Sequence, residues 1–171
     1  MRPRMRLLKP SNLFAASYDR YIKDLGLEER YPFPLDFDHS DFNEYLERVE
    51  DFALAKNLPD GYVQSTTLWL VEENEIVGVT NIRHELNDSI RHVGGHIGLS
   101  IKPSERGKNL GVELMKMSIL FLKDLGVSKV HIHCEKTNKA SSKTIQACGG
   151  ILESEISHSN KVIERYIVQN I

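Results

Sequence analysis

The chain has 171 residues, of which 40% are hydrophobic and 27% charged, and its formal net charge is −2 at pH 7. This length and composition are typical of one globular domain. The near-neutral charge gives no indication of a nucleic-acid partner. No apolar run approaches the roughly 18 residues that a membrane span requires.

The N-terminus and the cysteines indicate a cytoplasmic protein. The basic start, Met1–Arg6 (MRPRMR), is not followed by an apolar run, so we expect no signal peptide. Cys134 and Cys148 are the only cysteines and lack the spacing of a metal site. His131 and His133 would share one face of a strand, which alone is a poor metal signal. We therefore expect a soluble, reduced, cytoplasmic protein without a metal.

The N-terminal third predicts two helices joined by a packed loop. Leu7 and Leu8 predict a short strand before the first helix. Apolar residues at helical spacing predict helices from Ser11 to Leu25 and from Asp41 to Lys56. Between them, residues 28–39 (EERYPFPLDFDH) carry two prolines and alternating aromatic side chains, which are costly to leave in water.

An antiparallel meander follows. β-Branched and apolar runs predict strands from Thr66 to Glu72, from Ile76 to Arg83 and from Arg91 to Ile101. Glu73 and Asn74 predict a tight hairpin turn between the first two. Three glycines interrupt the third strand, which indicates a bulge or a close approach to a ligand.

The C-terminal half predicts one long, largely buried helix and then shorter elements. In order they are a helix from Asn109 to Leu125, a strand from Lys129 to Cys134, a helix from Lys139 to Cys148 capped by Asn138, and strands from Ile151 to Ile156 and from Val162 to Val168. The strand after the long helix runs parallel to the preceding one if the unit is strand–helix–strand. The whole order predicts an α+β fold with a mixed sheet and one parallel pair.

The segment Gly94–Gly111 (GGHIGLSIKPSERGKNLG) joins the glycine-interrupted strand to the long helix. At its end, Arg106–Gly111, backbone N–H groups, two cations and a helix N-terminus converge, which favours phosphate. Three interpretations arise: a solvated turn, a nucleotide phosphate loop, or the pyrophosphate loop of a coenzyme A enzyme. The nucleotide-binding patterns GxxxxGK[ST] and GxGxxG with a following acid are absent, which disfavours the second.

The loop and its surroundings resemble one family. Arg106–Gly111 (RGKNLG) resembles the (Q/R)-x-x-G-x-(G/A) signature of the GNAT acyltransferase superfamily. Asn138–Ser141 (NKAS) resembles the Asn-x-x-Ser after the family's fifth strand, and Gly149–Gly150 stands where Gly-Phe is usual. The segments NIRH, GGHIG and KTIQACGG resemble a bacterial subgroup. The resemblance implies a single GNAT-like domain over residues 1–171, with a mixed, mostly antiparallel central sheet flanked by helices and with splayed fourth and fifth strands.

The resemblance further implies an acetyl-CoA-dependent N-acetyltransferase. The pantetheine arm would pair with the fourth strand, the pyrophosphate would rest on the loop amides, and Asn138 would hold the thioester end or the pantetheine. The implied acetyl-CoA-binding residues are Leu99, Ser100, Ile101, Arg106, Gly107, Lys108, Asn109, Leu110, Gly111, Val112 and Asn138. Asn109 replaces a glycine of the signature, although asparagine tolerates a left-handed φ.

The implied reaction is attack of a primary amine, from a small molecule, peptide or protein, on the thioester. Ile145 stands where many members carry a tyrosine as general acid, so Ser141 or Ser142 is the remaining donor. His96 is the first candidate base, with His84 and Glu85 second. A histidine that merely satisfies a local hydrogen bond is the open alternative for His96.

The acceptor is not identified by any motif. Tyr31, Phe33 and Phe37 either line its pocket or pack into the core. A coenzyme A-binding module without turnover is the alternative function, because of Asn109 and Ile145. We expect neither a nucleic-acid nor a membrane partner, and the sequence leaves a homodimer open.

Overall fold

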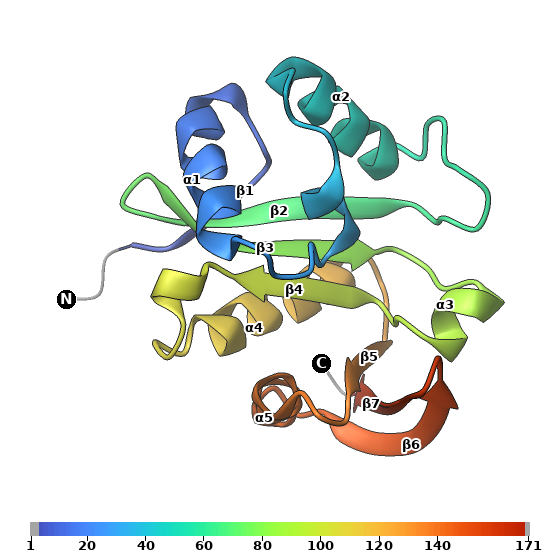
Figure 1. Ribbon diagram of the computed structural model, residues 1–171. Coiled ribbons are helices and arrows are strands. Elements are labelled where there is room, and N and C mark those ends of the chain that lie inside the picture. Colours follow the sequence, from blue (N-terminus) through green and yellow to red (C-terminus); the bar gives the residue numbers. More distant parts are fainter. Residues whose placement is uncertain (1–3, 170–171) are drawn as a thin grey trace.

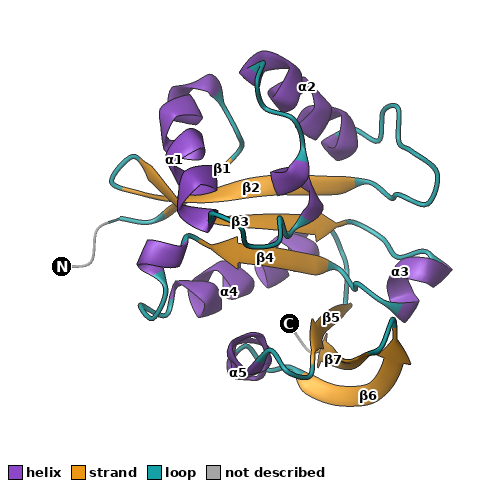
Figure 2. Ribbon diagram, in the orientation of Figure 1, coloured by secondary structure: helices purple, strands orange, loops and turns teal. Residues whose placement is uncertain are grey.

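The structure consists of two β-sheets with helices packed against them (Figures 1 and 2). The computed structural model describes residues 4–169. In chain order the elements are β1 (Arg6–Leu8), η1 (Asn12–Phe14), α1 (Ala15–Leu25), η2 (Phe33–Asp36), α2 (Phe42–Ala53), β2 (Ser65–Glu72), β3 (Glu75–Arg83), α3 (Asp88–His92), β4 (Ile97–Ile101), η3 (Pro103–Glu105), α4 (Leu110–Asp124), β5 (Lys129–Glu135), α5 (Lys139–Ala147), β6 (Ile151–His158) and β7 (Lys161–Gln169). Among these residues, no helix has the length and apolar character needed to cross a bilayer.

The larger sheet has the order β1-β2-β3-β4 and is antiparallel throughout. Helices α1 and α2 cover one face and α4 covers the other (Figure 1). Under α1 and α2, Trp69 is fully buried and stacks on Tyr18, with ring centroids 5.5 Å apart. Under α4, the buried Leu122 packs in one cluster with Ile82 of β3 and Ile97 of β4. Each face is closed by its own apolar core.

The smaller sheet has the order β5-β7-β6 and is also antiparallel. Helix α5 packs on this sheet and against α4. Ile145 of α5 is fully buried in the same cluster as Ile132 of β5 and Tyr166 of β7. The cluster under α4 therefore continues beneath the smaller sheet.

The two sheets meet at the start of β4 and then separate. The connection is an isolated bridge between Gly95 and Ile132. His96 N donates to His131 O at 2.7 Å, and His131 N donates to His96 Nδ1 at 2.9 Å. Within residues 4–169, β4 and β5 form no ladder beyond this point. The predicted parallel pairing of β4 with β5 is thus absent from the described residues, and we call the separation of these two strands the split. It agrees with the splayed fourth and fifth strands that the family resemblance implies.

The strand predicted from Arg91 is wrong over residues 91–96. Only Arg91 and His92 belong to a regular element, the short helix α3, where Asn87 Oδ1 accepts a hydrogen bond from Ile90 N at 2.8 Å as the N-cap. Gly94 and Gly95 then turn the chain with φ of +130° and +70°, so the strand begins only at Ile97. The first predicted helix also starts differently, because residues 12–14 form a 3-10 turn before α1.

The other predicted elements are confirmed to within three residues at their ends. Asp41 caps α2 by accepting from the amides of Asn43 and Glu44. The hairpin turn at Glu73 and Asn74 has φ of +47° and +68° at these two residues, as a two-residue hairpin of the favoured twist requires. The loop before α2 is packed, with Leu35 and Phe37 buried.

Candidate active site

The loop between β4 and α4 presents a row of unpaired backbone N–H groups. Asn109 adopts a left-handed conformation with φ of +66°, and Gly107 has φ of +81°. This turn aims the start of α4 outward. In the part of the chain that the structure describes, the amides of Gly107–Val112 have no hydrogen-bond partner. Six consecutive donors at a helix N-terminus form a site suited to an anion.

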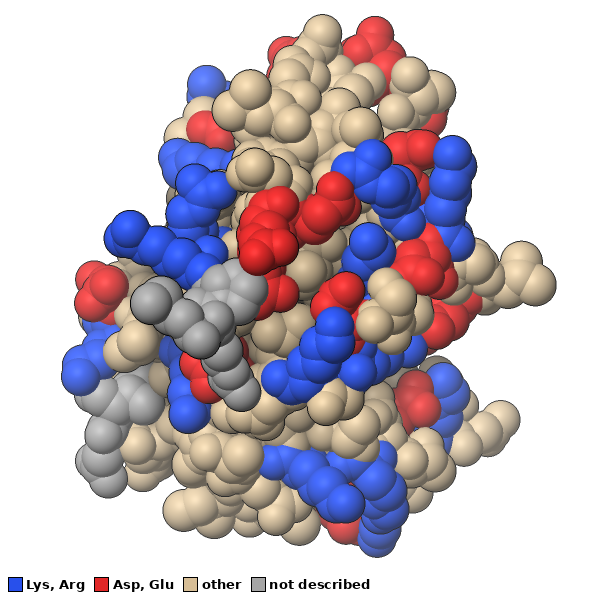
Figure 3. Space-filling view, turned by 90° about the vertical axis from the view of Figure 1, so that its left-hand side faces the viewer, with Lys and Arg blue, Asp and Glu red and all other residues tan. Residues whose placement is uncertain are grey.

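The cations of this loop are already paired with carboxylates. Arg106 donates from Nη1 and Nη2 to the two oxygens of Glu28 at 3.0 and 2.8 Å, and from Nε to Ile101 O at 3.1 Å. This pair lowers the pKa of Glu28 and raises the pKa of Arg106. Lys108 Nζ lies 2.6 Å from Glu105. Figure 3 shows acidic and basic side chains interspersed on this side of the molecule. In this loop, the groups that remain free to bind an anion are therefore the backbone amides of Gly107–Val112.

The free edge of β4 faces the split. Arg83 N donates to His96 O and Lys102 N donates to Val77 O, which fixes the phase of the β3–β4 ladder. In an antiparallel ladder, alternate residues point their N–H and C=O groups to opposite edges. The main-chain groups of Leu99 and Ile101 consequently point to the split. Those of Ser100 point to β3, unlike the expectation for this residue, and its Oγ lies 2.8 Å from Tyr21 Oη.

Tyr31 lies on the α1–α2 face of β4. A Cβ placed on Gly98 would lie 2.8 Å from the Tyr31 hydroxyl oxygen. Although 43% of the tyrosine is exposed, its hydroxyl end lies inside the protein, where burial raises the pKa of the phenol. Phe33 and Phe37 instead pack with Phe52, with ring centroids 5.2 and 5.7 Å apart. Of these three loop aromatics, Tyr31 reaches β4 and the two phenylalanines belong to the core.

His96 lies where β4 and β5 meet. Its Nδ1 already accepts the hydrogen bond from His131 N, and only 5% of the residue is exposed. Burial is the largest cause of a pKa lowered to about 4, and nearby cations act in the same direction. Its side chain lines a hollow of about 320 Å³ with residues 126–129, beyond the C-terminal end of α4. A group with this pKa is a weak base at neutral pH, so the geometry favours a structural role.

His84 follows the last residue of β3, and Glu85 comes next in the chain. The alternation of β3 directs His84 toward α4, where its ring lies 5.9 Å from that of Phe121. His84 Nε2 lies 2.7 Å from Thr66 Oγ1, and burial lowers the pKa of His84. Glu85 is exposed in the following loop. The structure therefore does not bring His84 to the α1–α2 side of the split.

Asn138 caps α5, as its position predicts. Its Oδ1 accepts a hydrogen bond from Ser141 N at 3.1 Å, so this oxygen is occupied and the side-chain amide remains available. Ile145 is fully buried and carries no proton donor. Ser142 Oγ lies 2.8 Å from Tyr166 Oη, away from the loop.

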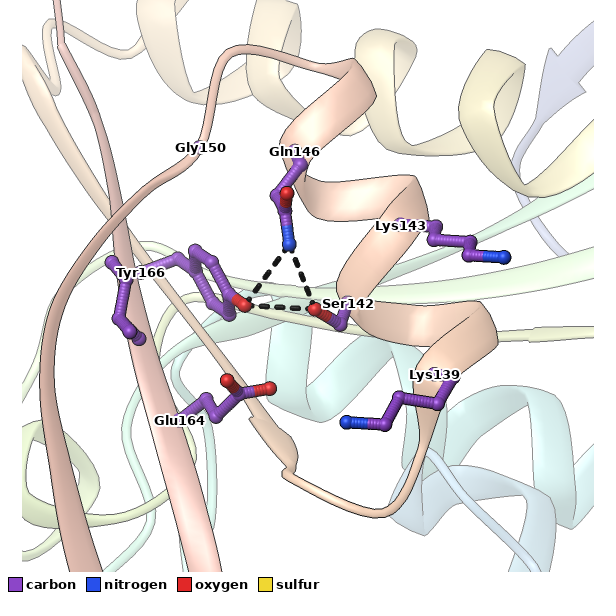
Figure 4. A pocket seen from close by; sticks show the side chains of 8 residues that line it. Lys139, Ser142, Lys143, Gln146, Gly150, Glu164 and Tyr166 are labelled. Carbon is purple, nitrogen blue, oxygen red and sulfur yellow. Dashed lines mark hydrogen bonds between the residues drawn. The ribbon is translucent and has the colours of Figure 1, made fainter.

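A pocket of about 610 Å³ lies on the outer flank of α5 (Figure 4). Gln146 donates to both Ser142 and Tyr166 at 2.9 and 3.3 Å, and the buried Glu164 lies beside them. The opposite flank of α5 faces α4, since Thr144 approaches Gly111. None of the residues 94–112 lines the pocket, so it is separate from the loop and from the split.

Two functional candidates were not identified from the sequence, Arg83 and His133. Arg83 Nη1 donates to Gly95 O at 2.8 Å, and Gly94 N donates to His133 Nδ1 at 2.9 Å. One side chain from β3 and one from β5 thus hold the same glycine pair from two sides. The sequence signal for this contact is Arg83, a cation at the end of a strand whose other residues are mostly apolar.

We expect the stability to fall between pH 7 and pH 5. Burial is the largest cause that lowers the pKa of both His96 and His133 to about 4, against 6.5 in the unfolded chain. In this window the unfolded chain binds protons that the folded chain does not, so the free energy of unfolding decreases by roughly 1–2 kcal/mol per histidine. Urea denaturation across this range measures the slope. His133→Gln should reduce it by about one proton, and an unchanged slope would contradict the assignment.

Comparison with known proteins gives one family and many similar folds. A family described as Acetyltransferase (GNAT) domain matches residues 5–151. No curated protein sequence matches the chain. Among solved structures, the microcin C7 self-immunity acetyltransferase MccE, in complex with acetyl-CoA and AMP, has a TM-score of 0.70 at 19% identity, covering 96% of this chain and 92% of that one.

Two further structures extend this similarity. The putative acetyltransferase yncA from Salmonella typhimurium, with its cofactor acetyl-CoA, has a TM-score of 0.66 at 16% identity over 96% of this chain and 93% of that one. The ribosomal-protein-S5-alanine acetyltransferase from Vibrio fischeri has a TM-score of 0.67 at 18% identity over 97% and 92%. At these identities the similarity establishes the fold alone.

Proposed function

This chain belongs to the GNAT acetyltransferase family and is an acetyl-CoA-dependent N-acetyltransferase; we propose that Gly107–Val112 and the free edge of β4 bind acetyl-CoA. The six unpaired loop amides carry the proposal, because they match a pyrophosphate in charge and geometry. The main-chain groups of Leu99 and Ile101 offer a strand-like edge to the amides of a pantetheine arm. Because β4 and β5 separate, this edge has no ladder partner among residues 4–169 and is the one we assign to the arm.

The residues of this chain support the reaction by placement and polarisation. Acetyl-CoA supplies an acetyl thioester, whose carbonyl carbon a free amine attacks as the carbon–sulfur bond breaks. The gap-facing N–H of Leu99 is the donor we assign to the developing oxyanion. A thiol has a pKa of about 8.5, so the sulfur leaves as thiolate without a dedicated acid. This explains why a buried Ile145 is compatible with turnover.

The proton of the amine passes to water in this proposal. A primary amine with a pKa near 10.4 is mostly protonated at neutral pH, so some of it must be deprotonated before attack. His96 takes no part in this transfer in our proposal, because its pKa is lowered to about 4 and its Nδ1 already accepts a hydrogen bond from His131 N. The acceptor is an amine of a small molecule, peptide or protein that enters from the α1–α2 side, where Tyr31 lies against Gly98.

Turnover tests the proposal directly. The purified chain is mixed with acetyl-CoA and a panel of amines, and the release of free thiol is followed. We expect release that depends on the amine and on both components. Binding of coenzyme A without thiol release on any amine would contradict the catalytic function, and absence of coenzyme A binding would contradict the site.

Arg106 and Glu28 provide a further prediction on the same loop. Arg106→Ala should weaken coenzyme A binding by roughly tenfold if the guanidinium assists the pyrophosphate. Glu28→Gln should then strengthen binding by a few fold, because it releases Arg106 from its carboxylate partner. Titration calorimetry of both variants measures these changes. If Glu28→Gln weakens binding as much as Arg106→Ala, the pair only holds the loop in place and Arg106 is no phosphate ligand.

A further inference from the structure

Arg83 is a partly buried cation without a carboxylate partner. Among residues 4–169, no carboxylate lies within 4.0 Å of its guanidinium, whereas the guanidinium groups of Arg20 and Arg106 each pair with a glutamate. Burial lowers the pKa of Arg83, and the groups that act in the opposite direction are Tyr31 and Tyr62 rather than an acid. A buried charge ordinarily has a partner. The missing partner therefore calls for a functional explanation.

The guanidinium has one edge free. Its Nη1 donates to Gly95 O at 2.8 Å, which fixes the orientation of the side chain. In the described part of the chain, no hydrogen bond engages Nε or Nη2. These two N–H groups lie on the same edge of the planar group and match the two oxygens of a carboxylate. A single cation with two parallel donors suits a carboxylate better than a phosphate dianion.

Arg83 lies on the acceptor side of the split. Asn81, two residues before it on β3, is the ladder partner of Gly98. Side chains two residues apart on a strand share a face and are roughly 7 Å apart. The Tyr31 hydroxyl lies against Gly98 on that face. The guanidinium is thus within the length of an amino acid or dipeptide of the place where Tyr31 meets β4.

We propose that the acceptor is an amine that also carries a carboxylate, and that the free edge of Arg83 binds this carboxylate while the amine lies in the split. The proposal rests on the proposed acetyltransferase function and adds the chemical class of its acceptor. Arg83 sets specificity and takes no part in proton transfer. The Gly95 contact keeps the guanidinium in position before the acceptor arrives.

Matched acceptors test this class. Each amino acid or short peptide is compared with its own carboxamide, which keeps the amine and removes the negative charge. The wild-type chain should turn over the carboxylate member with kcat/KM roughly 10- to 100-fold higher than the carboxamide. Free amino acids and peptides form separate arms, because both sources present the same amine and carboxylate chemistry.

Two variants assign the discrimination to one residue. Arg83→Gln should remove the preference by lowering kcat/KM for the carboxylate member alone, and Arg83→Lys should retain only part of it. Arg91→Gln removes a charge from the exposed helix α3 and should leave the preference unchanged. Turnover of the carboxamide reports whether each variant is folded.

The outcomes separate the two levels of the proposal. Equal turnover of both members by the wild-type chain would overturn the acceptor class and leave the acetyltransferase function intact. A loss on both members in Arg83→Gln, with Arg83→Lys behaving as wild type on both, would make Arg83 a structural contact of Gly95. Absence of thiol release from every amine would overturn the function and the acceptor class together.

Discussion

Gly95→Ala should destabilise the chain by roughly 3–5 kcal/mol, an exceptionally large effect for the addition of one methyl group. Gly95 has φ of +70°, and a Cβ there would lie 2.5 Å from the backbone oxygen of His131. The contacted atom belongs to the backbone of β5, which cannot move aside as the end of a flexible side chain can. The strand β5 would have to move, breaking the two hydrogen bonds between His96 and His131. The cost combines left-handed strain with buried polar groups left unpaired.

Gly126→Ala is the matched control for the strain. Gly126 has φ of +89°, but a Cβ there meets nothing within 4 Å, so only about 1 kcal/mol should be lost. Urea denaturation of both variants measures the difference. Gly95→Ala losing no more than Gly126→Ala would show that β5 is not held at this bridge. The position matters for function because the bridge sets where β4 and β5 begin to separate.

The sequence predicted local features of the site reliably. Asn138 as a helix cap and Asn109 as a tolerated left-handed residue follow from the chemistry of one side chain and its own backbone. The capped start of α2 at Asp41 is of the same kind. Each of these features depends on contacts between residues a few positions apart, so the local sequence is sufficient to predict it.

Long-range contacts were the part that the sequence did not reveal. Arg106 and Glu28 are 78 positions apart, and Gly94 and His133 are 39 apart. Nothing in the local pattern of either partner marks such a pair. His96 illustrates the consequence: its position on the predicted strand favoured a base, whereas the hydrogen bond from His131 and the burial at the bridge make it a weak one.

The strand predicted from Arg91 failed for a related reason. The segment Val93–Ile97 contains two adjacent glycines, Gly94 and Gly95. Glycines at such a position are compatible with a bulged strand as well as with a turn. In the folded chain the turn is closed by Gly95 N donating to Ile90 O, and it also receives hydrogen-bond partners from two different strands, Arg83 of β3 and His133 of β5. These tertiary contacts favour one of two local conformations that the sequence left nearly equal.

The two ends of the proposed coenzyme site are built on different principles. At the loop, the anion meets backbone N–H groups whose number and direction depend on the conformation of Gly107 and Asn109. At the split, the reacting group meets a strand edge whose position depends on the Gly95 bridge. A substitution at one end should therefore change binding of the phosphates, and a substitution at the other should change the chemistry or the fold.

Gly107→Asp should weaken coenzyme A binding by roughly 30- to 100-fold. A carboxylate introduced about 6 Å from a pyrophosphate charge repels it by about 2–3 kcal/mol at the dielectric of a protein surface. The substitution itself should be tolerated, because a Cβ at Gly107 meets nothing within 4 Å and aspartate is among the residues that adopt a positive φ. Affinity should therefore fall without a comparable loss of stability.

Gly107→Asn is the control that separates charge from shape. Asparagine has nearly the same volume as aspartate and the same tolerance of a left-handed φ, so coenzyme A binding should change by no more than a few fold. The defect of the aspartate variant should also shrink as salt is raised, because the loop is exposed and the repulsion is screened. Calorimetry at two ionic strengths measures both effects.

Acetyl-pantetheine, which lacks the pyrophosphate, completes the test. Turnover of this shortened donor should be the same in the wild-type chain and in Gly107→Asp, since the introduced charge then has nothing to repel. If both Gly107 variants weaken coenzyme A binding equally, the loop is sensitive to shape and the charge argument fails. If Gly107→Asp binds coenzyme A as the wild type does, the amides of Gly107–Val112 do not hold the phosphates, and the site must be sought elsewhere along β4.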